Sequence, residues 1–352
     1  MLWIGRKLLR HGAARLKLRY YILRRVLLFA PVLIGLSVIT FVISHLVPGD
    51  PVGLAAGPGA TPQQLDALRQ AYGMDKQLPL QYLQYMLNVL HGDLGRSMMS
   101  GHSVRDDLGA FFPNTLELVL ISMLIALVVG IPLGIAAAVW RDRWPDQLSR
   151  IFALGSISVP AFWLAIVLQL LLAMTLQVLP VGGIYDPRST MPPSHTGFLL
   201  LDTLLDGDPA AFGMAFQHTI LPAITLALAP IAFIVRILRA DVLETLNSDW
   251  VKMVRANGMP ERVILFKYVL KNSLIATIAV FGFLVGYSLG GSVVIETVFD
   301  WPGVGLYAVN SAIALDFQPI MGVTLLIGLL FLVVNLVTDL SYGVLDPRIR
   351  YG

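Results

Sequence analysis

The residue types that usually carry chemistry are sparse in this chain, and they are not grouped. The 352 residues include six histidines and no cysteine, and no two histidines lie three or four positions apart. There is no Walker A motif to cradle nucleotide phosphates and no H-E-x-x-H pair to bind zinc. Disulfides and cysteine-based metal sites are excluded. We therefore expect no catalytic residue, no nucleophile elbow, no metal site and no cofactor bound by this chain.

One polar segment, 241–272, interrupts the apolar C-terminal half and carries signals for the start and end of a helix. Asn247 and Ser248 are favoured N-cap residues, and Asp249 complements the positive end of a helix dipole. Gly258 suits the position that follows a helix, and a proline at 260 prevents continuation. The spacing predicts a helix of about two turns, which is too short to be stable in water unless it docks on another surface.

The apolar residues of this predicted helix are Trp250, Met253 and Val254, which lie close together at helical spacing. Two interpretations remain open at this point. Trp250 and Met253 could anchor the helix in a groove of a cytosolic protein, or the helix could pack on the ends of the chain's own spans. Under the first interpretation, the segment would receive energy from a partner, because this chain has no nucleotide motif of its own.

The remaining sequence is typical of a membrane protein. Hydrophobic residues make up 56% of the chain and charged residues 13%, whereas soluble proteins carry roughly 25% charged residues. Since lipid offers the backbone no hydrogen-bond partner, long apolar blocks must be helices. We expect an all-α polytopic membrane protein with six transmembrane helices, each about 20 residues long, at Val26–Val47, Leu116–Val139, Ile151–Val178, Ile220–Leu238, Leu274–Ile295 and Ile320–Leu340.

Lysine and arginine are distributed unequally between the two sides of these spans. Of the 25 such residues, 20 lie in 1–25, 141–150, 236–272 and the C-terminal tail, and the alternate segments hold the other five. By the positive-inside rule, both termini and the polar segment 241–272 face the cytosol. This topology explains the excess of basic residues, and nothing further supports a nucleic-acid partner.

Charged residues within the spans bear on how such a protein could be driven. Glu117, Arg236, Glu296 and Asp339 all lie near span ends, where long side chains can reach the interface. A carboxylate kept in the middle of a membrane usually has a task such as proton relay. We expect no buried carboxylate here, which argues against a proton-driven carrier.

The segment 48–113 is the largest piece on the other side of the membrane. Thr61 and Pro62 are favoured at a helix start. A second helix follows, with a leucine stripe that consists of Leu80, Leu83, Leu87 and Leu90. These helices could cap the pore, receive a soluble partner, or simply pack on the span ends.

Many stretches resemble the membrane permease subunits of bacterial ABC importers for dipeptides, oligopeptides and nickel, and specifically the first of their two permeases. The similarity begins at Tyr20 and covers nearly the whole chain. It includes YGMDKQLPLQYLQYM at 72–86, PNTLEL at 113–118, SVPAFWL at 158–164, LPVGG at 179–183, ETVFDWPGVG at 296–305 and LDPRIRY at 345–351. Each stretch alone is weakly specific, but together they are highly specific.

The resemblance implies the type I ABC importer permease fold, with a coupling helix near 247–259 that contacts an ATPase. Lys252, Met253 and Val254 occupy the E-A-A positions of the importer motif, and Ala276 stands where many relatives have proline. The site residues that it implies are Trp250, Met253, Val254, Arg255, Ala256, Asn257, Gly258 and Met259. No residue of the substrate pathway can be assigned.

The resemblance also implies how the chain is divided and what accompanies it. The expected units are a basic leader (1–25), the first span with its extracytoplasmic segment (26–113), a five-helix core (114–342) that contains the coupling loop (241–273), and a cytosolic tail (343–352). The partners would be membrane lipid, a second homologous permease, two cytosolic ABC ATPases that bind ATP and Mg, and an extracytoplasmic substrate-binding protein.

The function that this implies is uptake of short peptides, including dipeptides, oligopeptides or glutathione-like peptides, across the bacterial inner membrane. This chain would catalyse no bond change itself. A nickel-chelate importer is the alternative within the family. A secondary carrier and an intramembrane enzyme are alternatives from other classes. The carrier would need a buried carboxylate, and the enzyme would need a nucleophile or metal cluster in the spans.

Overall fold

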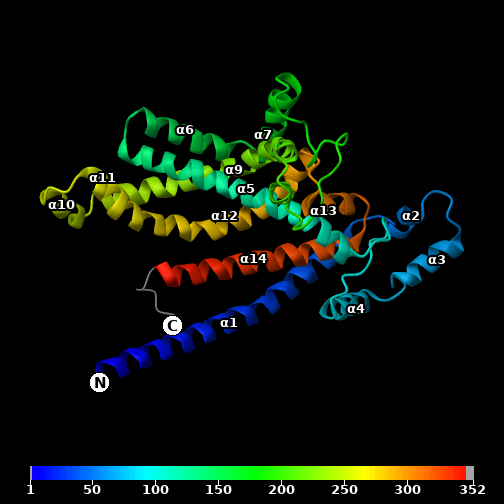
Figure 1. Cartoon of the computed structure of the whole chain (residues 1–352). Coiled ribbons are helices and arrows are strands. Elements are labelled where there is room, and N and C mark those ends of the chain that lie inside the picture. The colour runs from blue at the N-terminus through cyan, green and yellow to red at the C-terminus, as the bar shows by residue number, and fades with distance from the viewer. Residues whose placement is uncertain (1, 346–352) are drawn as a thin grey trace.

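The computed structural model describes the backbone of residues 2–345 and the side chains of 20–341, apart from those of 157 and 279, and this part contains helices but no strand. The long helices run roughly side by side (Figure 1). Five of them are long and apolar enough to cross a membrane. They are α1 (Leu2–Leu46), α5 (Val104–Val139), α9 (Pro209–Leu246), α12 (Leu270–Val298) and α14 (Phe317–Leu345).

The expected span at 151–178 is not a straight helix. Its residues belong to α6 (Trp144–Ser158), α7 (Ala161–Leu168) and a π-helical turn, η1 (Gln169–Thr175), and the direction changes by 106° between α6 and α7. Proline has no N–H and disfavours a helical conformation in the residue before it. Val159, which precedes Pro160, is accordingly extended, with φ −92° and ψ 127°. Counted as one broken span, this pair completes the expected six.

Helix α9 lies at the centre of the bundle and packs most extensively on α5. Two glycines of α5 permit the close approach. A Cβ atom on Gly130 would lie 2.9 Å from the side chain of Ile234, and one on Gly134 would lie 3.1 Å from that of Leu238. Small residues four positions apart on one helix face allow two helices to approach closely in this way.

Glycines also recur four positions apart in α12, at 282, 286 and 290, and they differ in what surrounds them. In α12, a Cβ atom on Gly282 would overlap Thr338 of α14, and one on Gly286 would overlap the ring of Phe331. Nothing lies within 4 Å of the corresponding position on Gly290. The first two glycines therefore bring α12 against α14, while the third makes no such contact.

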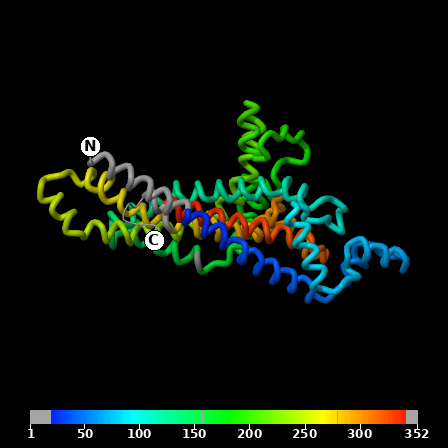
Figure 2. The backbone as a smooth tube through the Cα atoms, turned by 90° about the horizontal axis from the view of Figure 1, so that it is seen from below, coloured from blue at the N-terminus to red at the C-terminus, as the bar shows by residue number. Residues whose placement is uncertain are grey.

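Helix α1 lies at the edge of the bundle, alongside α14 (Figures 1 and 2). An ion pair joins the two helices, with 2.9 Å between Arg25 Nη2 and Asp339 Oδ2. Only 6% of the most apolar window of α1 is buried within the chain. Its remaining apolar surface is therefore left to lipid or to another subunit.

Three short helices follow α1 at the end of the bundle that lies away from the N-terminus: α2 (Pro51–Ala56), α3 (Pro62–Ala71) and α4 (Leu78–Leu90). The predicted start of α3 is confirmed as a capping box, in which Thr61 N donates to Gln64 Oε1 at 2.8 Å and Gln64 N donates to Thr61 Oγ1 at 3.4 Å. The leucine stripe of α4 is exposed. It therefore does not pack on the span ends.

The expectation that the chain buries no carboxylate is wrong. Glu117 of α5 is only 4% exposed, and Glu296 of α12 is 0% exposed. Glu117 accepts hydrogen bonds of 2.8 Å from the backbone nitrogens of Leu199 and Leu200, at the start of α8 (Leu199–Leu205). Because these N–H groups have no acceptor within their own helix, the carboxylate supplies one.

Glu296 plays the same part for α13 (Val304–Ile313). Its Oε2 accepts from Gly305 N at 2.7 Å and Leu306 N at 3.0 Å, while Oε1 accepts from Thr115 Oγ1 at 2.8 Å. Position near a span end predicted exposure, but the short helices α8 and α13 fold over these ends and cover the carboxylates. Both side chains connect elements that lie far apart in the sequence.

Candidate functional site

The predicted short helix is present as α10 (Asp249–Ala256), at the tip of the bundle opposite α4 (Figure 1). Ser248 is its N-cap residue in extended conformation, without a side-chain capping bond. Gly258 has φ +78°, which is the left-handed region that favours glycine, and its N–H donates to Arg255 O at 3.0 Å. Pro260 then begins the three-residue helix α11 (Glu261–Val263). The boundaries expected from sequence are confirmed.

Val251, which the sequence analysis did not single out, attaches α10 to the rest of the chain. Its side chain is 0% exposed and belongs to a buried cluster with Ala138 of α5, Leu238 and Val242 of α9, and Ile264 of η2 (Ile264–Val269). Val254 and Met259 pack around the same cluster. The spacing of valines at 251 and 254 was the available signal, because residues three apart share a helix face.

The predicted apolar face is therefore divided between two sides of α10. Val254 lies on the inner side with Val251, whereas Met253 is 61% exposed and Trp250 is 37% exposed. The prediction that these three form one face is corrected, since Val254 packs inward beside Val251 whereas Trp250 and Met253 are exposed. Two large apolar side chains consequently remain free on the outer side of a docked helix.

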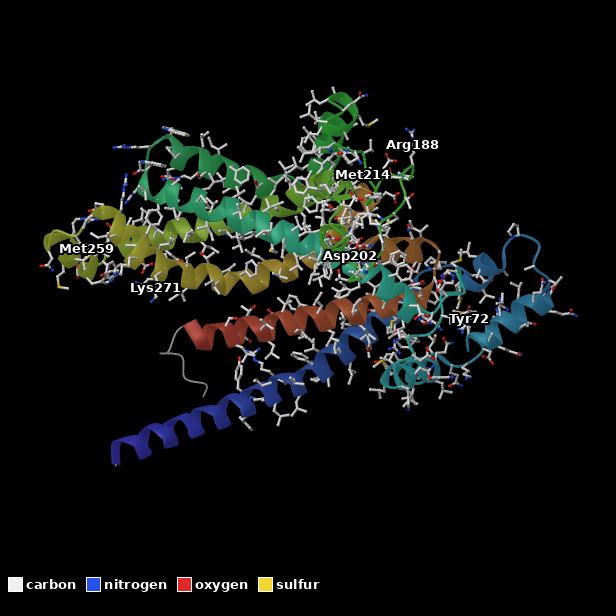
Figure 3. All side chains as sticks on the ribbon, in the orientation of Figure 1. Tyr72, Arg188, Asp202, Met214, Met259 and Lys271 are labelled. Atoms are coloured by element: carbon white, nitrogen blue, oxygen red, sulfur yellow. The ribbon has the colours of Figure 1, made fainter. Side chains whose placement is uncertain are left out.

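The other expected site residues lie around the C-terminal end of α10. Arg255, Ala256, Asn257 and Gly258 are exposed, and Met259 is half-buried. In Figure 3, the label of Met259 marks this tip of the molecule and that of Tyr72 marks the opposite end. The structure thus brings all the expected residues together in one short stretch of surface, with Val254 and Met259 turned inward.

Two ion pairs lie at the ends of this stretch of surface. Lys252 Nζ donates to Asp249 Oδ1 at 2.9 Å, and this hydrogen bond lowers the pKa of Asp249. The guanidinium of Arg255 binds both carboxylate oxygens of Glu261, with 3.1 Å from Nη2 to Oε2, and this lowers the pKa of Glu261. All four side chains are exposed, so each pair contributes little to stability.

A groove lies beside α10, between the end of α9 and the start of α12. Its volume is about 700 Å³, and its lining includes Asp241, Glu244, Trp250, Asn272 and Ser273. Asp241 Oδ2 is buried without a hydrogen-bond partner. The exposed apolar residues of α10 therefore border a recess with acidic side chains, which suits a protein surface that carries a complementary basic group.

In the part of the chain that the structure describes, the residue types that could bind a metal are scattered. Among the described residues, no group of three or more His, Asp or Glu side chains could hold a metal ion. The expectation that the chain has no G-x-S-x-G sequence is wrong, since residues 286–290 read GYSLG. They lie inside α12, with Ser288 0% exposed, rather than at the strand-to-helix turn that presents a nucleophile.

The acidic loop between η1 and α8 is likewise occupied by structural contacts. Asp202 is 2% exposed and accepts four hydrogen bonds, from the backbone nitrogens of His195, Thr196 and Gly197 and from Thr196 Oγ1. Burial acts to raise the pKa of Asp202, but these donors hold it below its usual range. Asp202 therefore shapes the loop and is not available to a ligand.

Comparison with known proteins finds two family models that together match residues 18–351. Residues 130–351 match the model of the binding-protein-dependent transport system inner membrane component, and residues 18–133 match the N-terminal model of that membrane component. Over 321 residues the chain is 46% identical to the probable D,D-dipeptide transport system permease protein DdpB of Escherichia coli K12, covering 91% of this chain and 94% of that protein.

Two further relatives show similarity of the same extent. The chain is 38% identical over 334 residues to the dipeptide transport system permease protein DppB of Escherichia coli K12, covering 94% of this chain and 98% of that one. It is 37% identical over 331 residues to the glutathione transport system permease protein GsiC of Escherichia coli O6:H1, covering 94% and 99%. The expected helical, multi-span permease fold is confirmed, and the chain belongs to the binding-protein-dependent transport system inner membrane component family of ABC transporter permeases.

Proposed function

We propose that this chain is the non-catalytic membrane permease subunit of an ATP-driven importer of short peptides. The observation that carries the proposal is the similarity over nearly the whole chain to permeases named for D,D-dipeptide, dipeptide and glutathione transport. None of these three is named for nickel, so the nickel-chelate alternative is not favoured. Selection among peptides would fall largely to the extracytoplasmic binding protein that delivers them.

In this proposal, α10 is the coupling helix and faces the cytosol, as do both termini. Trp250 and Met253 would enter a groove of a cytosolic ATPase, since they are the large apolar side chains that α10 leaves exposed. The basic segments 141–150 and 236–272 support this orientation. ATP and Mg would be bound by two ATPase subunits, and this chain would contribute no group to hydrolysis.

The attachment of α10 suggests how its movement reaches the membrane. Val251 is packed against residues of α5, α9 and η2, and η2 continues directly into α12. A close-packed cluster transmits displacement instead of absorbing it. When the ATPases close on ATP, a shift of α10 would therefore move the cytosolic ends of three spans together, which opens the path on the other side.

A second, homologous permease would complete the pathway. Its proposed contact surface is the exposed apolar face that α5, α6 and α7 form, on the side of the bundle away from α1 (Figure 1). Large exposed side chains on this face include Leu120 and Leu124 of α5, Leu154 of α6 and Trp163 of α7. An exposed apolar area of this extent marks a protein or lipid contact.

The test uses the exposed side chain at position 253. In the whole transporter, Met253→Asp should abolish retention of the ATPase subunits and the ATP hydrolysis that the binding protein stimulates. Met191→Asp is the matched control, because Met191 is 56% exposed in the loop between η1 and α8 and does not belong to the cluster that holds α10. Normal ATPase retention and stimulation in the Met253 variant would rule out the coupling role.

The substrate and the energy source need a separate measurement. Uptake of a labelled dipeptide should require ATP and the cognate binding protein, should persist with a protonophore, and should not be competed by a nickel chelate. Uptake that survives ATP depletion but stops with the protonophore would instead identify a secondary carrier.

A further inference from the structure

Helix α4 combines features that a water-exposed helix does not usually show. Its sequence, LPLQYLQYMLNVL, contains no charged residue. Leu80, Leu83, Leu87 and Leu90 are 54%, 55%, 49% and 78% exposed, so none of the side chains that the structure describes covers the leucine stripe. A contiguous apolar stripe of this kind marks a surface that is buried in something else.

The two other sides of α4 are accounted for within the chain. Tyr82 faces α1, where its hydroxyl lies 2.8 Å from Ser37 Oγ and its ring lies 5.3 Å from that of Phe41. Gln81, Gln84 and Asn88 line a pocket of about 190 Å³ beside α3 and α14. The leucines therefore point away from both the bundle and the polar pocket.

The contact with α1 places α4 at membrane depth. Ser37 precedes Leu46, the last residue of α1, by nine positions, which is about 13 Å along a helix axis. Half of a hydrocarbon core is about 15 Å thick. In Figure 1, α4 lies below the end of α1 and close to the bundle, whereas α3 projects beyond it.

The part of α1 on which α4 packs is otherwise exposed and apolar. Ile39, Val42, Ile43 and Leu46 are 58%, 47%, 57% and 74% exposed, on the side of α1 turned away from Ser37 and Phe41. A span with such an apolar free face has to face lipid at this depth. The packing of α4 on this span, together with the absence of charge, favours acyl chains over a soluble protein as the occupant.

We propose that α4 is embedded in the membrane leaflet at the end of the bundle opposite α10, with its leucine stripe in the acyl chains and its polar side toward the pocket. The helix would lie against α1 within one leaflet, since its contact with Ser37 is about 13 Å from the end of that span. This proposal requires only that the chain spans a membrane, and it does not depend on the identity of the substrate.

The test exploits the absence of cysteine from the chain. A bimane label is attached to Leu87→Cys in the whole transporter, with the partners' reactive cysteines replaced, in vesicles of phosphatidylcholine. The matched control is Asn88→Cys, the adjacent exposed residue on the polar side. Phosphatidylcholine brominated on its acyl chains should quench the label at 87 several-fold more than the label at 88, and iodide in the buffer should show the opposite order.

Two results would overturn the proposal. Quenching at 87 by iodide but not by brominated lipid would show that the stripe faces water. Quenching by neither would show that a protein covers it, either the second permease or a soluble partner. Leu83→Cys provides a second position on the same stripe, so failure of one variant to assemble leaves the test intact.

Discussion

Removal of the Glu296 carboxylate tests whether buried charge in this chain serves to join helices. Glu296→Ala deletes the acceptor of three donors: the backbone nitrogens of Gly305 and Leu306, and the hydroxyl of Thr115. The glutamate side chain is 0% exposed, so water does not readily replace it. We expect the start of α13 to lose its attachment to α5 and α12.

The size of the effect follows from the number of bonds lost. A buried donor left without an acceptor costs about 1–3 kcal/mol. At the lower figure, three such donors amount to roughly 3 kcal/mol, and each 1.4 kcal/mol is about a tenfold change in an equilibrium constant. Amide hydrogens at 304–307 should therefore exchange on the order of 100-fold faster, because the local opening that exposes them becomes more favourable.

Hydrogen–deuterium exchange with mass spectrometry, on the purified transporter, measures this directly. Glu296→Gln should show a smaller increase, since its amide oxygen still accepts hydrogen bonds but carries no charge. Glu244→Ala removes an exposed glutamate near α10 and should leave residues 304–307 unchanged. If Glu296→Ala also leaves their exchange unchanged, the capping explanation is refuted.

Three further predictions concern packing and coupling. Gly258→Asp and Trp250→Ala should insert into the membrane normally but lose stimulated ATPase activity. Gly258→Asp places a side chain at φ +78°, where it is strained, and Trp250→Ala removes an exposed apolar anchor. Normal peptide uptake by either variant would contradict this. Gly282→Val should lower the thermal unfolding temperature by separating α12 from α14, whereas Gly290→Ala, in open space, should not. Asp146→Asn should loosen α6 from α9, since Arg239 donates to both oxygens of Asp146 at 2.6 and 2.9 Å, and exchange of the 144–150 amides reports it.

Local chemistry made the coupling segment predictable. Gly258 specifies the end of α10 through its own backbone preference, and Ser248 is a residue type favoured at a helix start, so neither signal needs information about neighbours. The inner face was not predictable in the same way. The two turns of α10 contain Trp250, Val251, Met253 and Val254. Which side of this helix is buried depends on where α5, α9 and η2 lie. That arrangement is a property of the bundle.

The broken span shows the same limit. Pro31, Pro132, Pro222 and Pro230 all lie inside continuous helices, whereas the chain leaves the helical conformation just before Pro160. Each proline removes one backbone donor, and in membrane helices neighbouring elements often compensate for that loss. Sequence therefore identifies the positions where a break is possible, while packing decides which position breaks.

The buried carboxylates of Glu117 and Glu296 bear on how transport is driven. The hydrogen-bond partners of these groups are more informative about their role than the fact that they are buried. A proton relay needs a carboxylate whose partners change and which water can reach during the cycle. Glu117 and Glu296 instead each accept two backbone N–H groups from the start of a short helix, where the helix dipole balances negative charge. Such bonds connect helices, and they engage both oxygens of each carboxylate. Burial alone would have suggested a gradient-driven carrier, but these contacts assign both residues to the scaffold, so the energy source has to be sought at the exposed side chains of α10.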